Sequence, residues 1–375
     1  MRKIKSKLFD LVLRKRLNKL GPVRPISELK REQVNRILVV SSTALGDTVL
    51  SLPAIRSTRS IFPGAEITWL LKKSYLELFR VVECVDDFIP YHGGYRKLKS
   101  LYQRVSSKSF DLCLIFHDSD PCPGGVAYLA GVPFILRSGL RDDQLAPYLS
   151  GRVTYVDDHH AIEQRLDVLR TIVGGGASFV NNLYLEVKVE SQKEWSSRLH
   201  EFCEESGTKK YIGFQTLAAK KYCVWPKEKF IALGKRLIRQ CSDVVLVLLG
   251  ARGEKRYCQD IADGIASKKR VINLAGKYKV SELPAILKNF DLLVTNDTGP
   301  LHVAVAVGTP TVSLFVPSRI EHTGPNQDLH KHKVIRKVPP CNPCVRKYCD
   351  SPWCMNLISV DEVFDVINSG FHRCW

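Results

Sequence analysis

Short apolar runs alternate with longer amphipathic stretches along most of this 375-residue chain. Runs rich in Val, Ile and Leu predict buried strands, and the stretches between them repeat apolar residues at helical spacing. Strands that alternate with helices favour parallel sheets. Two such series, separated by a glycine cluster at 174–176 and a linker near 181–191, predict an α/β fold with two similar halves.

The first half begins with the predicted strand 36–41. Its other predicted strands are 67–71, 112–116, 134–136 and 153–156, and its predicted helices are 48–62, 95–107 and 161–173. The second half opens with a predicted helix at 192–206, and its predicted strands are 211–215, 244–249, 271–274, 292–295, 312–315 and 333–335. Because the carboxyl ends of parallel strands share one edge of a sheet, we expect ligands at that edge in both halves.

Positive charge is concentrated at the N-terminus. The formal net charge is +18, and residues 1–36 hold twelve Lys and Arg against three Asp and Glu, a net of +9. Apolar residues recur there at helical spacing, namely Ile4, Leu8, Leu11, Val12, Leu13, Leu17 and Leu20. A basic amphipathic helix suits anionic lipid headgroups, and a basic arm packed on its own domain is the alternative. Charges interrupt every apolar run, so a secretory signal is not expected.

The longest uncharged stretch, residues 298–318, has the 21 residues that a membrane span needs. It also holds three prolines, two glycines and His302, which argue against a transmembrane helix. Residues 294–315 instead predict a strand, a helix and a second strand. The helix begins near Thr298 and Gly299, whose backbone N–H groups can bind a phosphate. An ordinary capped helix is the alternative, since Asp and Thr are good capping residues.

A second polar segment follows the strand 36–41. Gly46 and Asp47 are expected at a turn there, facing the edge where ligands bind. The Asp47 carboxylate can accept a proton from an incoming hydroxyl as a general base, or it can cap a helix that begins at Thr48. No GK[ST] motif follows, so this segment is not a P-loop.

Further charged residues follow other predicted strands. Lys220 and Lys221 can neutralise a diphosphate or lie in solvent. Glu254 can bind ribose hydroxyls or cap a helix. Asp118 and Asp120 form a three-residue acidic pattern of the kind that holds a metal, but such patterns are common by chance. No convincing metal-binding acid pair lies in the second half, so we expect no metal in catalysis.

Twelve cysteines are spread along the chain, and most are expected to be reduced thiols. Four of them lie close together near the C-terminus, at Cys341, Cys344, Cys349 and Cys354. Thiolates are soft ligands, so these four can hold a structural zinc. Unligated structural cysteines are the alternative, since paired CxxC motifs normally lie further apart and Pro343 constrains the first one.

Four ordered segments carry a family resemblance: RILVVSSTALGDTVLSLPAIRSTRSIFPGAEITWL, VLLGARGEKRYCQDIA, NLAGKYKVSELPAIL and LLVTNDTGPLHVAVAVGTPTVSLF. Together they resemble glycosyltransferase family 9, the ADP-heptose:lipopolysaccharide heptosyltransferases, over roughly residues 36–367. The segment CNPCVRKYCDSPWCM is also similar to one common in this family.

The resemblance implies a GT-B fold, in which two Rossmann-like domains with parallel sheets face a cleft. With the basic segment 1–35 set apart, it implies an acceptor domain at 36–185 and a nucleotide-sugar domain at 190–357. A final helix within 358–375 can pack back on the first domain.

Site residues follow from the resemblance position by position. Asp47 becomes the expected catalytic base, beside Thr43 and Gly46 on the acceptor side. The expected donor-binding residues are Asp297, Thr298, Gly299, Pro300 and His302 at the helix start, together with Glu254, Lys220 and Lys279. Lys221 is expected to assist catalysis.

Two positions depart from the family pattern. Cys223 stands two residues before the Trp225–Pro226 pair, where the family often has Lys, so Lys221 or Lys220 is expected to supply the charge. Val316 stands where the family usually has Gly, although Gly324–Pro325 matches it.

The function implied is inverting transfer of a heptose from an ADP-activated donor to a lipopolysaccharide core acceptor, a lipid-linked saccharide. The expected location is cytoplasmic, with peripheral attachment to the anionic surface of the inner membrane. The alternatives are a hexosyltransferase of the same fold with another nucleotide donor and a GT-B-like nucleotide-sugar epimerase. A nucleic-acid partner is not expected, because no aromatic RNA-binding motif accompanies the charge.

Overall fold

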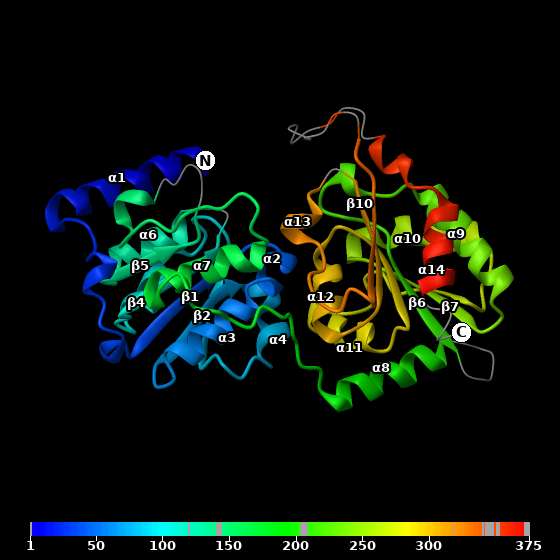
Figure 1. Ribbon diagram of the computed structural model, residues 1–375, viewed down its shortest axis with the longest axis horizontal. Helices are drawn as coiled ribbons and strands as arrows, with labels where there is room; N and C mark the ends of the chain where they lie inside the picture. Colours follow the sequence, from blue (N-terminus) through cyan, green and yellow to red (C-terminus); the bar gives the residue numbers. More distant parts are fainter. Residues whose placement is uncertain are drawn as a thin grey trace. The chain divides into compact units, whose positions relative to one another are not determined.

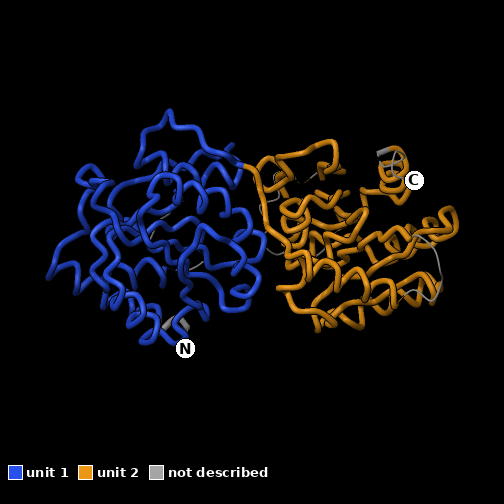
Figure 2. Tube along the Cα trace, turned by 90° about the horizontal axis from the view of Figure 1, so that it is seen from below, with its two compact units in different colours: residues 1–181 blue, residues 182–375 orange. Residues whose placement is uncertain are grey.

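The computed structural model describes residues 2–118, 121–139, 145–202, 209–316, 318–339, 341, 349 and 353–370. The chain divides into two compact units, residues 1–181 and 182–375, which Figure 1 and Figure 2 show. Each unit contains one parallel sheet with helices packed against it. The predicted α/β fold with two parallel sheets is confirmed.

The first sheet has the strand order β3-β2-β1-β4-β5. Its strands are β1 (Arg36–Ser41), β2 (Glu66–Lys72), β3 (Asp87–Tyr91), β4 (Leu112–His117) and β5 (Phe134–Arg137). The helices of this unit are α1 (Arg2–Leu20), α2 (Leu45–Val49), α3 (Leu52–Ile61), α4 (Leu76–Phe79), α5 (Leu98–Ser106), α6 (Cys122–Leu129) and α7 (Ala161–Val173). Its 3₁₀ turns are η1 (Ile26–Glu28), η2 (Arg31–Gln33), η3 (Lys73–Tyr75) and η4 (Ala146–Tyr148).

Three local predictions for this unit are wrong. Residues 153–156 form no strand, and β3 was not predicted. The helix predicted at 48–62 is two helices, because the chain bends between α2 and α3. Since α2 begins at Leu45, Gly46 and Asp47 lie in its first turn, and Asp47 does not cap a helix at Thr48.

The N-terminal segment forms the predicted helix, and α1 packs against α6. Phe9 and Leu13 point into the core of the first unit, where each is at most 5% exposed. Of the two interpretations of this segment, packing on its own domain is therefore observed. Leu8, Leu11 and Val12 remain exposed on other sides of the same helix.

The second sheet has the order β11-β10-β9-β6-β7-β8. Its strands are β6 (Lys210–Gln215), β7 (Val244–Leu249), β8 (Val271–Asn273), β9 (Leu292–Asn296), β10 (Thr311–Phe315) and β11 (His332–Arg336). The helices are α8 (Val189–Glu201), α9 (Lys227–Gln240), α10 (Lys255–Ile265), α11 (Leu283–Lys288), α12 (Gly299–Val307), α13 (Ile320–Thr323) and α14 (Val360–Gly370). The 3₁₀ turns are η5 (Lys221–Cys223), η6 (Arg252–Glu254), η7 (Val280–Glu282) and η8 (Cys354–Leu357).

The final helix packs within the second unit. α14 lies against α9, and the buried side chains of Val363, Phe364 and Ile367 join the core of the second sheet. The Trp225 indole N–H donates to the Ile358 carbonyl just before this helix, at 3.1 Å. α14 therefore belongs to the core of the second unit, and packing of the last helix on the first domain stays a prediction.

None of the helices in the described ranges is long and apolar enough to cross a bilayer.

Candidate active site

Both sheets place their switch points where site residues were predicted. In the first sheet the chain runs outward from β1 through β2 to β3, then crosses to β4 on the other side of β1. In the second sheet it runs outward from β6 to β8 and crosses to β9. Ligands of open α/β sheets bind at the carboxyl ends of the strands beside such a switch point. The β1–β4 and β6–β9 junctions are therefore the two candidate sites.

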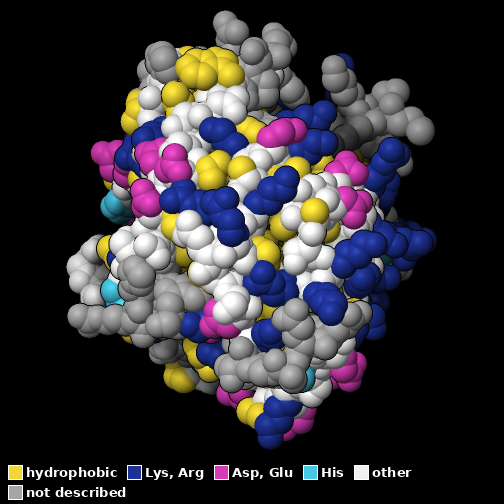
Figure 3. Space-filling model, turned by 90° about the vertical axis from the view of Figure 1, so that its right-hand side faces the viewer, with side chains coloured by type: hydrophobic (Ala, Val, Ile, Leu, Met, Phe, Trp, Pro, Cys, Tyr) yellow, Lys and Arg dark blue, Asp and Glu magenta, His cyan; other side chains and the backbone are white. Residues whose placement is uncertain are grey.

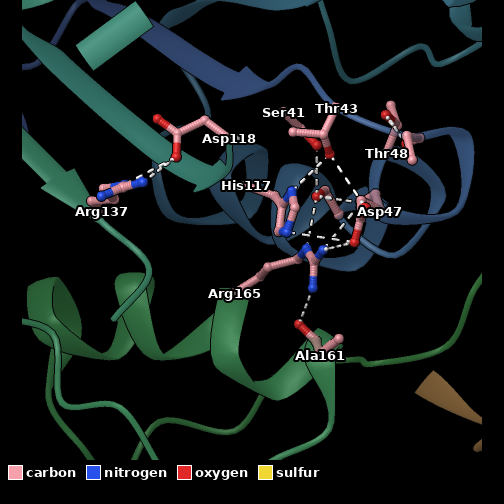
Figure 4. Close-up of polar contacts among 11 residues, drawn as sticks. Ser41, Thr43, Asp47, Thr48, His117, Asp118, Arg137, Ala161 and Arg165 are labelled. Atoms are coloured by element: carbon pink, nitrogen blue, oxygen red, sulfur yellow. Dashed lines mark hydrogen bonds and ion pairs between the residues drawn. The ribbon is translucent and has the colours of Figure 1, made fainter. Parts of the chain in front are cut away.

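At the β1–β4 junction the strand register shifts after Val40, so that Ser41 lies beside His117. β1 continues through Thr43 into α2, whose first turn carries Asp47. Figure 4 shows the side chains of Thr43, Asp47 and His117 converging at this edge. The structure thus brings the predicted Asp47 and Thr43 together with a histidine that was not predicted.

Short polar distances join the three side chains of this cluster. The Thr43 hydroxyl donates to Asp47 Oδ2 at 3.3 Å, and the same Oγ1 lies 2.7 Å from His117 Nδ1. The other ring nitrogen, His117 Nε2, lies 3.5 Å from Asp47 Oδ1.

His117 is neutral at physiological pH in this environment. Its pKa is lowered to about 4 because burial disfavours the charged ring and the positive charge of Arg165 repels it. The Asp47 carboxylate acts in the opposite direction but does not outweigh them. A neutral imidazole leaves Asp47 as the anionic group of the cluster.

Arg165 of α7 holds Asp47 from the protein side. Its side chain is buried, and its Nη2 donates to both the Oδ1 and the main-chain carbonyl of Asp47 at 3.3 Å. Its Nε donates to Ser51 Oγ at 2.9 Å, and its Nη1 donates to the Ala161 carbonyl. Asp47 itself keeps 31% of its side chain exposed. A carboxylate that is fixed on one side and open on the other can accept a proton from a substrate hydroxyl.

The acidic pattern that begins at Asp118 has a structural partner. The Asp118 carboxylate accepts hydrogen bonds from the Nε and Nη2 of Arg137, and both side chains are buried (Figure 4). Asp120 lies outside the described residues. The described half of the pattern is therefore engaged in an internal ion pair.

At the β6–β9 junction, β9 ends at Asn296 and α12 begins at Gly299. Thr298 has an extended backbone, and its side chain makes no capping hydrogen bond to the helix that it precedes. Gly299 and Pro300 form the first turn of α12, whose start carries partial positive charge. His302 follows within that turn, but it is only 5% exposed, so little of its ring is open to a ligand.

Asn296 organises the loop between β6 and α9, and it was not predicted. Its Oδ1 accepts from the Trp225 main-chain N–H at 2.9 Å. Its Nδ2 donates to the carbonyls of Gln215 and Thr216 at 3.3 and 3.0 Å. One buried amide therefore fastens both ends of this loop to the end of β9.

This loop carries Lys220 and Lys221. Burial lowers the pKa of Lys220, but Tyr222, Cys223 and Asp297 together outweigh burial, so the pKa of the ammonium is raised. The Lys220 ammonium therefore interacts with the Asp297 carboxylate, which precedes α12. The neighbouring Cys223 is buried, which places the position where the family often has Lys inside the fold.

Glu254 and Lys279 come from the adjacent loops after β7 and β8. Glu254 Oε2 accepts from the Ala251 main-chain N–H at 2.7 Å, so its carboxylate caps its own turn. The exposed Lys279 precedes η7 as its N-cap residue, and its main-chain N–H donates to Glu282. The Gly276 N–H donates to the Gly250 carbonyl, which joins the two loops. Gly276 has φ +73, and a Cβ there would lie 2.8 Å from the Arg252 backbone, so this close approach requires glycine.

The C-terminal cysteines are only partly described. Cys344 lies outside the described residues, Cys341 is exposed, and Cys354 is buried in the second core with its Sγ 3.8 Å from the Tyr222 carbonyl oxygen. Within the described ranges, no three His, Cys, Asp or Glu side chains are grouped to hold a metal ion. The zinc interpretation stays a prediction.

Comparison with known proteins now decides the family. Residues 99–353 match the model of glycosyltransferase family 9 (heptosyltransferase). This chain belongs to glycosyltransferase family 9. The chain is therefore a glycosyltransferase enzyme, as the resemblance predicted.

Related sequences and a solved structure are similar to this chain over most of its length. Lipopolysaccharide heptosyltransferase 2 of Escherichia coli K12 is 25% identical over 319 residues, which cover 81% of this chain and 88% of the relative. Lipooligosaccharide heptosyltransferase 2 of Campylobacter jejuni is 28% identical over 339 residues, with 88% and 96% covered. The solved structure of E. coli ADP-heptose lps heptosyltransferase II superimposes with a TM-score of 0.74 at 21% identity, covering 90% of this chain and 99% of that one. The predicted GT-B fold is confirmed.

Proposed function

We propose that this family 9 enzyme transfers a heptose from ADP-heptose to a lipopolysaccharide core acceptor. The relatives from E. coli and C. jejuni are named for lipopolysaccharide and lipooligosaccharide heptosyl transfer, and the E. coli structure is named for ADP-heptose. The observation that carries the proposal is the half-open Asp47 carboxylate, held by Arg165 at the β1–β4 switch point of a family 9 chain. The acceptor then binds to the first unit and the donor to the second.

The proposed reaction is a single inverting displacement. Asp47 takes the proton of the acceptor hydroxyl while the oxygen of that hydroxyl attacks the anomeric carbon of the heptose. The bond from that carbon to the diphosphate breaks, and ADP leaves with the negative charge. The first turn of α12 at Thr298 and Gly299, together with Lys220, stabilises the leaving diphosphate. Product NMR tests the stereochemistry, because a retained anomeric configuration would exclude one displacement.

Fixed positive groups make a divalent metal unnecessary in this scheme. The helix start and Lys220 are covalently part of the protein and supply the charge that Mg²⁺ supplies elsewhere. We therefore expect transfer to proceed at an unchanged rate in EDTA. Activity that EDTA abolishes and Mg²⁺ or Mn²⁺ restores would contradict this part of the proposal.

Asp47→Asn tests the general base. The amide keeps the shape of the side chain but cannot take a proton, so kcat should fall by about 10²–10⁴-fold. Binding of ADP to the second unit, measured by thermal shift, should be unchanged. Asp111→Asn is the matched control, because Asp111 lies at the amino end of β4 and accepts from the Asn35 and Arg36 N–H groups. Near-normal transfer by folded Asp47→Asn would remove Asp47 from this role.

Comparison of donors tests the sugar nucleotide. Purified protein is given a heptose-deficient lipopolysaccharide core and either ADP-heptose or UDP-linked hexoses. We expect transfer from ADP-heptose, and transfer from a UDP-linked hexose alone would replace the proposed donor.

The proposed acceptor is carried on a lipid, so the enzyme is expected to work at the cytoplasmic face of the inner membrane. Its net charge of +18 favours an anionic surface. Sedimentation of the protein with inner-membrane vesicles tests this location.

A further inference from the structure

α1 is fixed rigidly to the first unit. The Phe9 ring packs edge-on against Tyr95, with 5.4 Å between ring centroids. A Cβ on Gly125 of α6 would lie 2.7 Å from the Phe9 ring and 3.0 Å from Leu13, so the glycine allows the two helices to approach closely. The Tyr128 hydroxyl donates to the Gly21 carbonyl at the end of α1. The outward face of α1 is therefore held in a defined position.

That outward face borders an open apolar groove of about 710 Å³ between α1, α5 and α6. Leu8 is 60% exposed, Val12 43% and Tyr102 41%, and less exposed apolar side chains, among them Leu98 and Leu129, also line the groove. Singly exposed apolar side chains are ordinary on a protein surface, but a contiguous apolar patch marks a contact with a partner or a membrane.

Basic side chains surround this groove. Lys15, Arg16 and Lys19 of α1 and Lys99 of α5 line it, and no acidic residue does so within the described ranges. None of these four forms an ion pair with another described residue, whereas Arg14 on a different side of α1 pairs with Asp10. On the face in Figure 3, by contrast, Lys and Arg lie among acidic and uncharged side chains. The groove thus combines an apolar centre with cations that have no ion-pair partner among the described residues.

We propose that this groove docks the protein on an anionic lipid bilayer. Leu8, Val12 and Tyr102 enter the boundary between headgroups and acyl chains, and the surrounding cations contact lipid phosphates. This surface assigns a docking face to the membrane partner of the proposed function and rests on that function.

The composition of the groove favours a bilayer over other partners. Binding to an anionic bilayer is strengthened both by insertion of apolar side chains and by positive charge. Stable peripheral binding needs these two contributions together. A nucleic acid would contact the cations, but Tyr102 is the one exposed aromatic side chain among the described lining residues, and the leucine and valine side chains offer bases no stacking surface. A protein partner would need acidic residues that face these cations around an apolar centre, which makes it the second outcome of the test.

Point variants of the full-length protein test the proposal, because removal of α1 would open the core at Phe9 and Leu13. The apolar variant is Leu8→Gln with Tyr102→Gln, and the basic variant is Lys15→Gln with Lys19→Gln and Lys99→Gln. Matched controls make the same changes at exposed positions of the second unit, namely Leu329→Gln with Val338→Gln, and Lys235→Gln with Lys268→Gln and Lys269→Gln. Thermal melts confirm that each variant is folded.

Co-sedimentation with vesicles of phosphatidylcholine, with and without phosphatidylglycerol, measures docking. The wild type should bind the anionic vesicles, and less tightly as salt is raised. Each cation near an anionic surface strengthens binding about fivefold, so the basic variant should bind about 100-fold more weakly. The apolar variant should bind at least about tenfold more weakly, since both signals are required. The control variants should bind like the wild type.

Groove variants that bind anionic vesicles as the wild type does would overturn the proposal. Failure of the wild type to bind, or equal binding to neutral vesicles, would overturn it as well. If the groove were needed for binding RNA or a partner protein, and the enzyme did not bind vesicles, that molecule and not the bilayer would be the partner. Transfer to a deacylated, water-soluble acceptor should be unchanged in the groove variants. If neither the wild type nor any variant transferred to this soluble acceptor while vesicle binding still depended on the groove, the proposed function would be contradicted. The proposed docking surface would still be supported.

Discussion

Replacement of Arg165 by Met removes the buried cation behind Asp47 and keeps a side chain of similar length. The guanidinium donates to Ser51, to Ala161 and twice to Asp47, so it ties α7 to the start of α3 and to α2. Loss of one partner from a buried ion pair costs about 3–5 kcal/mol. Asp47 keeps 31% of its side chain in solvent, so water replaces part of the guanidinium. We therefore expect the free energy of unfolding of the first unit to fall by about 2–3 kcal/mol.

The same change should affect catalysis and the neighbouring histidine. Without Arg165 the Asp47 carboxylate is no longer fixed on the protein side, and kcat/KM should fall about 10- to 100-fold. Arg165 is one cause of the lowered pKa of His117, because its positive charge repels the imidazolium. Its removal should raise the pH at which His117 titrates, and NMR of the imidazole protons measures that shift.

Hydrogen exchange read by mass spectrometry reports the stability of the first unit separately, and steady-state kinetics report kcat/KM. Arg170→Met is the matched control, because Arg170 lies on the same helix but pairs with Glu163 and Asp167, each at 2.7 Å. It should leave kcat/KM and the titration of His117 unchanged. The reasoning would be refuted if Arg165→Met unfolded like the wild type and also kept its kcat/KM.

Three further outcomes follow from the second unit. Lys220→Ala should raise the KM for the donor about tenfold, because a charged contact to the diphosphate is lost, and Lys221→Ala should change it little; equal effects in donor kinetics would contradict the assignment. Burial lowers the pKa of His332 to about 4 in the folded protein, so as pH falls this side chain is protonated in the unfolded chain before it is protonated in the folded one. The second unit therefore loses stability as pH falls from about 6.5 toward 4. Melting temperatures of His332→Gln should depend less on pH over this range, and an identical dependence would exclude His332 as the cause. Asn296→Leu leaves the Trp225 N–H and two carbonyls without their amide partner, so urea unfolding should show a loss of about 2–4 kcal/mol; unchanged urea unfolding would mean that water satisfies these groups.

The elements that the sequence predicted correctly are those with a strong local pattern. Strands such as β1 and β7 are continuous apolar runs, and the pattern of α7 predicted its bounds as the structure has them. β3 was missed because it is a five-residue edge strand that contains Pro90 and is only partly buried. Residues 153–156 have a strand-like composition, but the sheet already ends at β5. Pairing with a neighbour decides whether such a segment becomes a strand, and pairing is a property of the tertiary structure.

The sequence by itself determined which strand ends carry polar chemistry. Thr43 and Asp47 follow β1, and Thr298 follows β9, because residues after parallel strands come to one edge of a sheet wherever the chain goes next. Only the tertiary structure decided that Arg165 holds Asp47 and that His117 faces it. Arg165 lies 118 residues after Asp47 in a predicted helix. From the sequence alone, an arginine there is expected to be an ordinary solvent-exposed charge. Local periodicity reports which face of an element is buried, whereas the partner of a buried charge depends on how distant elements pack together.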